Sequence, residues 1–170
     1  QKEDIFNRTV AHKIFSLGHE KIAIKLSDLP FECLIGTLYA EAAASFENIT
    51  LGDTDDTLTR QDPGAWPNAF RKARFLSAVD HVQLDRLRMI AINEMNAFFE
   101  DVDFIIGPMA VNSMLIVSNF TGHPCLQIPV GFEELATRNE LSLASGKLEL
   151  GAPIAHGKKH LVPRGVSVWA

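Results

Sequence analysis

The longest regular pattern of hydrophobic and polar positions covers residues 78–100. Its apolar residues recur at three- and four-residue spacing, which is the period of an amphipathic helix, and they are Val79, Val82, Leu87, Ile90, Ala91 and Phe98. Glu94 is the only polar residue on or near this stripe. A stripe of this kind belongs to a hydrophobic core far more often than to a cofactor site. We therefore predict a long helix that packs against the core.

The N-terminal part of the chain predicts two further helices. Residues 4–17 form a helical pattern that ends at Gly18, and glycine readily adopts the left-handed conformation of a helix C-cap. Residues 30–46 form the next pattern, with a proline in the first turn, where proline is tolerated. Either Ser27 or Asp28 can cap this second helix.

Four short stretches predict strands, and two long polar stretches predict loops. Apolar and polar residues alternate over 22–26, which indicates a strand with one buried face. The apolar run 102–106 is typical of a strand buried on both faces, and the remaining strands are predicted at 125–130 and 162–169. The polar stretches 48–67 and 133–160 predict loops, the first with one helical turn at 55–59.

The central part of the chain has the order strand, helix, strand. Asn112 or Ser113 can cap a helix between the strands 102–106 and 125–130. This order predicts a βαβ unit with parallel strands and a right-handed crossover. We expect an α/β fold, a layered α/β/α arrangement with a mixed sheet, in a single domain over residues 1–170.

Composition narrows the classes of protein. With 46% hydrophobic and 22% charged residues, the chain has the composition of a globular domain. A formal net charge of -5 argues against a surface that neutralises phosphates, so no direct contact with nucleic acid is expected. No apolar run approaches the roughly 20 residues that span a bilayer, so no membrane partner is expected. The 2 cysteines form no CxxC pattern, and we expect a reducing, cytoplasmic location.

Sequence motifs for metal and cofactor sites are missing. His19 and Glu20 would open a zinc-binding HExxH motif, but Ala23 stands where the second histidine belongs. The chain contains no P-loop, no GxGxxG and no GxSxG pattern. We therefore expect no metal and no cofactor.

Thr121-Gly122-His123-Pro124, followed by Cys125, allows two interpretations. A histidine near a cysteine is a candidate for nucleophilic catalysis. The structural interpretation is favoured, because Gly122 can end the preceding helix and Pro124 forces His123 into an extended conformation. Cys125 is then a small apolar filler at the start of a buried strand.

Two longer stretches resemble a known family. "ARFLSAVDHVQLDRLRMIAINEMNAFFEDVDFIIGP" and "SNFTGHPCLQIPVGF" resemble the C-terminal half of the amidase signature family, and "LGHEKIAIKLSDLP" and "DTLTRQDPGAWPNAFRKARF" resemble segments upstream. The resemblance runs with gaps from about residue 12 to 132 and resumes at "HLVPRGVSVWA". It implies an amidase-type fold and a structural motif made by Asn119, Thr121, Gly122, Pro124 and Gly131.

The resemblance also implies a function. Members of this family hydrolyse amides with a serine nucleophile, a second serine and a lysine base, in a region N-terminal to the one matched here. We expect the chain to be a fragment of such an amide-bond hydrolase, with no catalytic residue of its own, and to be inactive alone. Two alternatives stay open: the A subunit of a tRNA-dependent (glutamyl-tRNA) amidotransferase, and a non-catalytic binding or scaffold module that retains half of the fold.

The substrate pocket is expected where the first strand of the βαβ unit ends. Ligands of open α/β sheets bind beyond the carboxyl ends of the strands, and the following helix directs its free N–H groups to the same place. The resemblance agrees, and the expected substrate-binding residues are Pro108, Met109, Asn112 and Ile116. The expected partners are a small-molecule amide, the N-terminal half of the same protein, and a second copy of the chain where an apolar sheet face is left uncovered.

Overall fold

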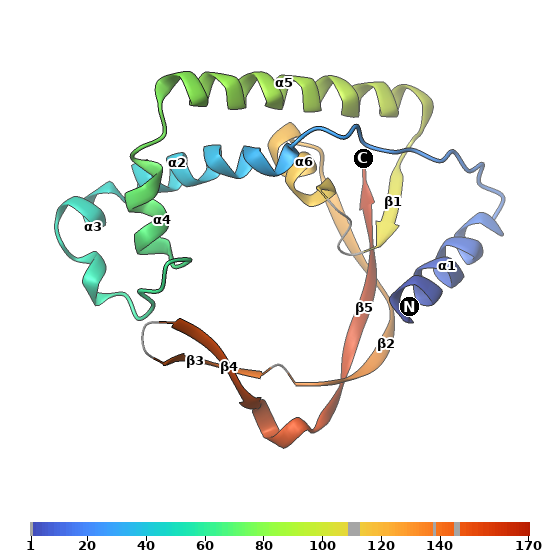
Figure 1. Ribbon diagram of the computed structural model, residues 1–170. Coiled ribbons are helices and arrows are strands. Elements are labelled where there is room, and N and C mark those ends of the chain that lie inside the picture. Colours follow the sequence, from blue (N-terminus) through green and yellow to red (C-terminus); the bar gives the residue numbers. More distant parts are fainter. Residues whose placement is uncertain (1, 109–112, 138, 145–146) are drawn as a thin grey trace. The chain divides into compact units, whose positions relative to one another are not determined.

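The computed structural model describes residues 2–108, 113–137, 139–144 and 147–170 (Figure 1). Contacts between residues group the chain into two compact units. Unit 1 consists of Gln1–Glu32, Arg88–Glu133 and Leu161–Ala170, and unit 2 of Cys33–Leu87 and Glu134–His160. Helices and strands occur in both, so the chain is a mixed α and β protein, as the sequence predicts.

The two N-terminal helices are confirmed. Helix α1 spans Lys2–Phe15, and Gly18 after it has a φ of 96°, the left-handed conformation predicted for a C-cap. The second helix begins as the 3-10 helix η1 (Phe31–Leu34) and continues as α2 (Ile35–Ser45). The predicted strand over 22–26 is wrong, because these residues are extended without strand pairing.

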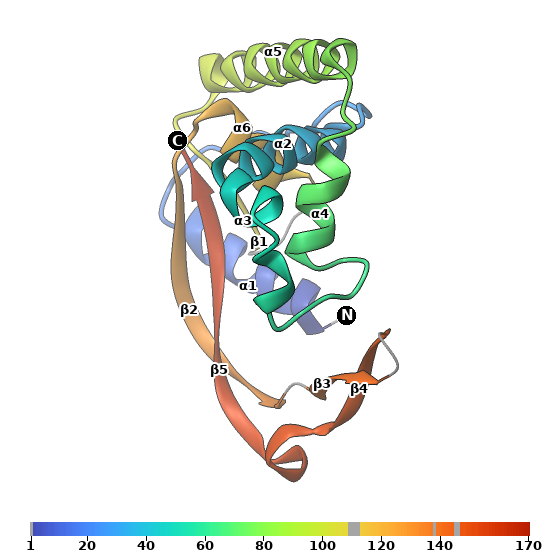
Figure 2. The same cartoon turned by 90° about the vertical axis from the view of Figure 1, so that its left-hand side faces the viewer.

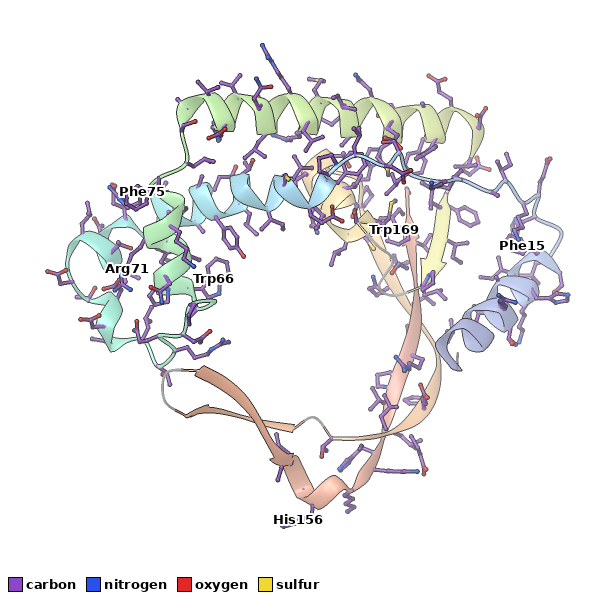
Figure 3. All side chains as sticks on the ribbon, viewed as in Figure 1. Phe15, Trp66, Arg71, Phe75, His156 and Trp169 are labelled. Carbon is purple, nitrogen blue, oxygen red and sulfur yellow. The ribbon has the colours of Figure 1, made fainter. Side chains whose placement is uncertain are left out.

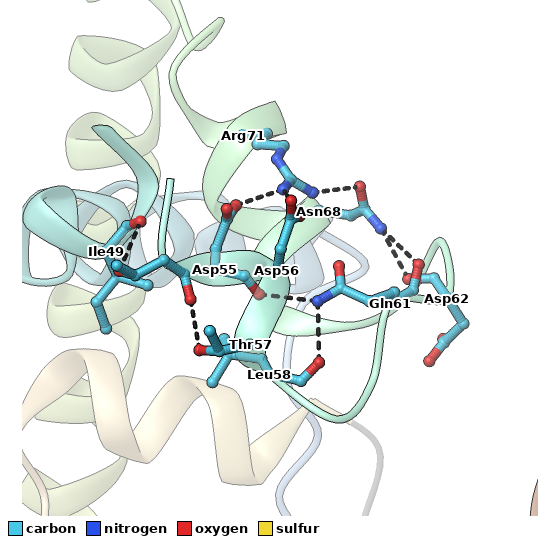
Figure 4. A network of polar contacts seen from close by, with 10 residues as sticks. Ile49, Asp55, Asp56, Thr57, Leu58, Gln61, Asp62, Asn68 and Arg71 are labelled. Atoms are coloured by element: carbon cyan, nitrogen blue, oxygen red, sulfur yellow. Dashed lines mark hydrogen bonds and ion pairs between the residues drawn. The ribbon is translucent and has the colours of Figure 1, made fainter. Parts of the chain in front are cut away.

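The loop predicted at 48–67 contains more helix than expected. Helix α3 spans Glu47–Leu51, η2 spans Asp55–Thr57, and α4 spans Trp66–Ala73. The helical turn expected at 55–59 is therefore present in shorter form. Polar contacts hold the irregular backbone between these helices (Figure 4).

Two aspartates of this loop are buried and paired with arginines. Asp55 is 3% exposed, and its Oδ2 lies 2.5 Å from Arg71 Nη2, as an ion pair without hydrogen-bond geometry. Asp62 is 6% exposed and accepts two hydrogen bonds from Arg60, at 3.0 and 3.1 Å. Gln61 Nε2 donates to the carbonyl oxygens of Asp55 and Leu58. Each buried charge thus has a local partner, which a buried carboxylate requires.

Helix α5, Ala78–Asp101, confirms the predicted long helix, but its packing differs from the prediction. Only Ala91 and Met95 are buried in it, whereas Val79 is 69% exposed and Val82 52%. Helical period therefore located the helix and the C-terminal part of its buried stripe, where Ala91 is buried and Leu87 and Phe98 are half-buried, but not its N-terminal part.

Unit 1 contains a three-stranded sheet in the order β1-β5-β2. Strand β1 (Ile105–Pro108) pairs antiparallel with β5 (Lys159–Trp169). Strand β2 (Cys125–Ala136) starts where β5 ends, since the Ala170 N–H donates to the Pro124 carbonyl. Strands β2 and β5 therefore also run in opposite directions (Figure 2).

This topology corrects the expected mixed sheet. Strands β1 and β2 run in the same direction, on either side of helix α6 (Met114–Thr121) in the sequence, as expected for a βαβ unit. They are not paired, however, because β5 from the C-terminal end of the chain lies between them. Neighbouring strands are thus antiparallel, and β1 is an edge strand in which only Ile105 is buried.

One side of β2 carries exposed apolar residues. Leu126, Ile128 and Phe132 share a strand face, because their positions differ by even numbers, and are 62%, 38% and 70% exposed. Cys125 is also exposed, so its predicted role as a buried filler is wrong. Apolar residues on this strand are therefore not covered by other described parts of unit 1.

The prediction of a loop over 133–160 is wrong, because this stretch forms two strands in unit 2. Strands β3 (Asn139–Ala144) and β4 (Lys147–Pro153) form an antiparallel hairpin, followed by η3 (Ile154–Gly157). The polar character that predicted a loop here is compatible with a two-stranded ribbon, because such a ribbon has no need of a fully apolar face.

Candidate functional site

A cavity of about 450 Å3 lies in unit 1 along β1 and beside the start of α6. The carboxyl end of β1 contributes Gly107 and Pro108, and the start of α6 contributes Ser113 and Met114. Residues 24–29 and the first two residues of η1 form another wall, and Trp169 of β5 completes the lining. The cavity therefore includes the strand end and helix start at which a ligand was expected, although its wall extends along the whole of β1 and the neighbouring strand is antiparallel.

Glu94 of α5 fixes the extended wall. Its carboxylate accepts hydrogen bonds from the Ser27 N–H at 2.5 Å and from the Ser27 Oγ at 2.6 Å. Ser27 was one of two candidate caps for the helix that follows, and its hydroxyl donates to Glu94 instead. It also explains why one carboxylate lies on an otherwise apolar helical stripe.

A second carboxylate, Glu32, contacts the beginning of α6. Ser113 precedes α6, but its hydroxyl makes no cap hydrogen bond to the helix and instead donates to Glu32. The predicted capping role of Ser113 is therefore wrong. The hydrogen bond from Ser113, with a smaller contribution from a backbone hydrogen bond, lowers the pKa of Glu32 below its usual range. Glu32 is therefore ionised at neutral pH.

The other charges that line the cavity compensate one another. Lys25 Nζ lies 3.3 Å from a carboxylate oxygen of Asp28, and both side chains are largely exposed. Glu32 has no ion pair with any cation in the described part of the chain. The cavity therefore carries one carboxylate without a counter-charge.

Trp169 gives the cavity a buried aromatic wall (Figure 3). It is 2% exposed, and its backbone lies opposite Ile105 in the pairing of β1 with β5. Its indole Nε1–H has no acceptor among the residues that the structure describes. A buried indole N–H usually has a partner, so this donor is a feature of the site that the sequence does not reveal.

The structure locates two of the four residues predicted to bind substrate. Pro108 is half-buried and lines the cavity. Ile116 is half-buried in α6 but is not part of the described cavity wall. Met109 and Asn112 lie outside the described residues.

The Thr-Gly-His-Pro segment joins α6 to β2. Gly122 is the left-handed C-cap of α6, with a φ of 83°, as predicted. His123 has two partners that the sequence did not indicate: its Nδ1 lies 2.7 Å from Thr121 Oγ1, and its ring stacks on Phe99 at a centroid distance of 5.0 Å. The hydroxyl and the imidazole are within the reach of a nucleophile and its base, but the other described contact of the ring is with Phe99, and the segment does not contribute to the cavity wall.

The remaining residues of the implied structural motif also have local contacts. Asn119 donates from Nδ2 to the Leu115 carbonyl at 2.7 Å, within α6. The Pro124 carbonyl accepts the hydrogen bond that ties β2 to the end of β5, and Gly131 lies within β2. These contacts connect helix, strand and sheet, and are structural in kind.

Several kinds of site are not found in the described part of the chain. No group of three or more His, Cys, Asp or Glu residues there could hold a metal ion. None of its helices combines the length and the apolar composition needed to cross a bilayer. No model of a known protein family matches the chain, and no curated protein sequence matches it either.

The sequence interpretation missed three residues of the cavity. They are Glu32, Trp169, and Ser113 as the hydrogen-bond donor to Glu32. These residues come from segments far apart in the chain, and Glu32 and Ser113 are 81 positions apart. The one available signal was Glu94, whose polar side chain interrupts the helical stripe and so indicates a specific partner.

Proposed function

We propose that the chain is the C-terminal portion of an amidase-type amide-bond hydrolase, and that its cavity holds the acyl part of a small-molecule amide. The observation that carries this proposal is the position of the cavity, along β1 and beside the start of α6. The resemblance to the amidase signature family implies an acyl-binding site at this place. The resemblance supports the proposed reaction, amide hydrolysis. The cavity supports the proposed binding of the acyl group.

The lining of the cavity suits an apolar acyl group. Its walls include Ile24, Leu26, Phe31, Ile105, Ile106 and Met114, which offer apolar contact surface. Its volume of about 450 Å3 falls within the range of small-molecule sites, roughly 300–1,000 Å3. Ser113 makes no cap hydrogen bond to α6, so its hydroxyl does not occupy the first N–H groups of this helix.

The chain alone is expected not to hydrolyse amides. The resemblance implies a serine–serine–lysine set outside the matched region, and acyl transfer without nucleophile and base loses most of its rate enhancement. Incubation with a serine-directed fluorophosphonate should leave the protein unlabelled. Stoichiometric labelling of one serine would show that this chain carries its own nucleophile.

A binding experiment tests the cavity itself. 4-Methylpentanamide has a small branched acyl group, and we expect isothermal titration calorimetry to detect its binding to the chain. Leu26→Trp, a half-buried residue of the cavity wall, should abolish binding because the indole occupies the cavity. Ile22→Trp serves as the matched control, because Ile22 lies in the same extended segment but outside this wall.

Two outcomes would contradict the proposal. The first is absence of binding by the wild-type chain in its folded state. The second is loss of binding in both tryptophan variants alike, which would indicate a general disturbance of the segment. Equal binding of branched amides and unrelated apolar molecules would favour the non-catalytic binding module instead.

A further inference from the structure

Glu32 differs from the other charged residues of the cavity. Its carboxylate is held by the Ser113 hydroxyl, so its position relative to the start of α6 is defined. Lys25 is paired with Asp28, and no described cation is paired with Glu32. A carboxylate that is positioned by a neighbour, ionised, and without a counter-charge is suited to accept hydrogen bonds from a cationic ligand.

The chemistry of the walls favours the same kind of ligand. The walls beside Glu32 are largely apolar, and the buried Phe31 and Trp169 are among the residues that form them. Lys25 and Asp28 also line the cavity, but their opposite charges are paired with each other and leave little to compete with Glu32 for a charged ligand. An aliphatic or aromatic carboxylate would be repelled by Glu32 and would find no unpaired described cation in this wall.

We propose that the cavity recognises an amide whose acyl part carries an ammonium group, as in an α-amino acid amide, and that Glu32 binds this group. The inference rests on the proposed function, because it specifies the class of amide that the same cavity accepts. Glu32 is a specificity-determining residue and takes no part in bond cleavage. The apolar wall then holds the side chain of the amino acid amide.

Two probes that differ by one group test this inference. Leucinamide is 4-methylpentanamide with an α-amino group, and at pH 6.5 this amine is largely protonated while Glu32 is ionised. In the wild-type chain, leucinamide should bind about fivefold more tightly than 4-methylpentanamide, which is the size of effect expected for an ion pair at an exposed carboxylate. Isothermal titration calorimetry measures both affinities.

The variants separate Glu32 from other causes. Glu32→Gln should reduce the preference for leucinamide to about one, while the affinity for 4-methylpentanamide stays within about twofold. Glu100→Gln removes an exposed carboxylate that does not line the cavity, so the preference should persist. N-Acetyl-leucinamide, which has no charge, should lose the advantage in the wild-type chain.

The possible results distinguish the two proposals. Equal affinity of the wild-type chain for the two probes would overturn the role of Glu32 and leave the amide-binding cavity standing. A preference that survives Glu32→Gln would also overturn it. Failure of both probes to bind the folded chain would contradict the cavity proposal, and this inference with it.

Discussion

Two regions of the molecule use carboxylates in different ways. In the loop of unit 2, the buried Asp55 and Asp62 are each paired with an arginine of the same unit. At the cavity of unit 1, Glu32 is exposed, is hydrogen-bonded to Ser113 and to its own backbone, and has no cation partner among the described residues.

The difference indicates which carboxylate is available to a ligand. A buried charge must be compensated within the protein, so it is committed to the fold. An exposed carboxylate beside a cavity costs little to leave without a counter-charge, since water solvates it until a ligand arrives. Asp55 and Asp62, whose charges are paired with arginines, are therefore structural. Glu32, whose charge has no cation partner among the described residues, is the candidate binding residue.

The largest expected effect on stability concerns the loop of unit 2 that contains the Asp55–Arg71 ion pair. Asp55→Asn removes the charge of a buried side chain and leaves Arg71, which is partly exposed, without its nearest partner. We expect the free energy of unfolding to fall by about 2 kcal/mol, below the range for fully buried pairs because the arginine is solvated. Urea denaturation followed by circular dichroism measures it.

Asp56 offers the matched control for this change. It lies 3.5 Å from the same arginine, but its side chain is 82% exposed, so Asp56→Asn should cost less than about 0.5 kcal/mol. Equal effects of the two substitutions would show that burial does not distinguish the carboxylates of this loop, and the comparison would fail.

The next effect concerns the end of α6 away from the cavity. Gly122 has a φ of 83°, and a Cβ there would meet no atom within 4 Å, so only backbone strain opposes substitution. Gly122→Val should lower the free energy of unfolding by about 1 kcal/mol or more, whereas Gly122→Asn should cost less because Asn tolerates this conformation. Thermal denaturation compares them. Unchanged binding of 4-methylpentanamide to the folded variants would confirm that this end of the helix is structural.

His123→Gln should have a small effect on both stability and binding. Glutamine retains a polar group near Thr121 and loses the ring contact with Phe99, so we expect a loss of about 0.5–1 kcal/mol. Affinity for 4-methylpentanamide should change less than twofold. A variant that stays folded and no longer binds the amide would place the Thr-Gly-His-Pro segment in the binding site and contradict the comparison of the two ends of α6.

The smallest effect concerns the pKa of Glu32. Ser113→Ala removes the hydrogen bond that lowers this pKa, so the pKa should rise toward its usual range. Because the pKa is lower in the folded state, Glu32 stabilises the wild-type fold above its unfolded pKa, and this contribution is lost as the pH falls through its folded pKa. Titration of the Glu32 carboxyl carbon by nuclear magnetic resonance measures the change. An unaltered pKa would mean that another group fixes the carboxylate.

Local features of this fold could be predicted from sequence. Gly18 and Gly122 end helices in the left-handed conformation because only local backbone geometry decides it, and the long helix follows from a 3.6-residue period. Pro108, expected at the pocket from its place at the end of a strand, is among the residues that line the cavity.

Pairings between distant segments could not be predicted. The insertion of β5 between β1 and β2 depends on which strands pair, and strand alternation carries no such information. The contact of Ser27 with Glu94 joins residues 67 positions apart, and the chemistry of the cavity depends on it. Candidate binding residues such as Glu32 and Trp169 appear only when these distant segments are brought together.

The most direct test of the central claim uses the two tryptophans of the chain. Trp169 lines the cavity in unit 1, and Trp66 belongs to α4 in unit 2 (Figure 3). In a chain labelled with nitrogen-15, titration with 4-methylpentanamide should shift the indole N–H signal of Trp169 in a saturable manner and leave that of Trp66 unchanged. A saturable shift of Trp66 alone, or no shift of either signal in the folded protein, would contradict the assignment of amide binding to this cavity.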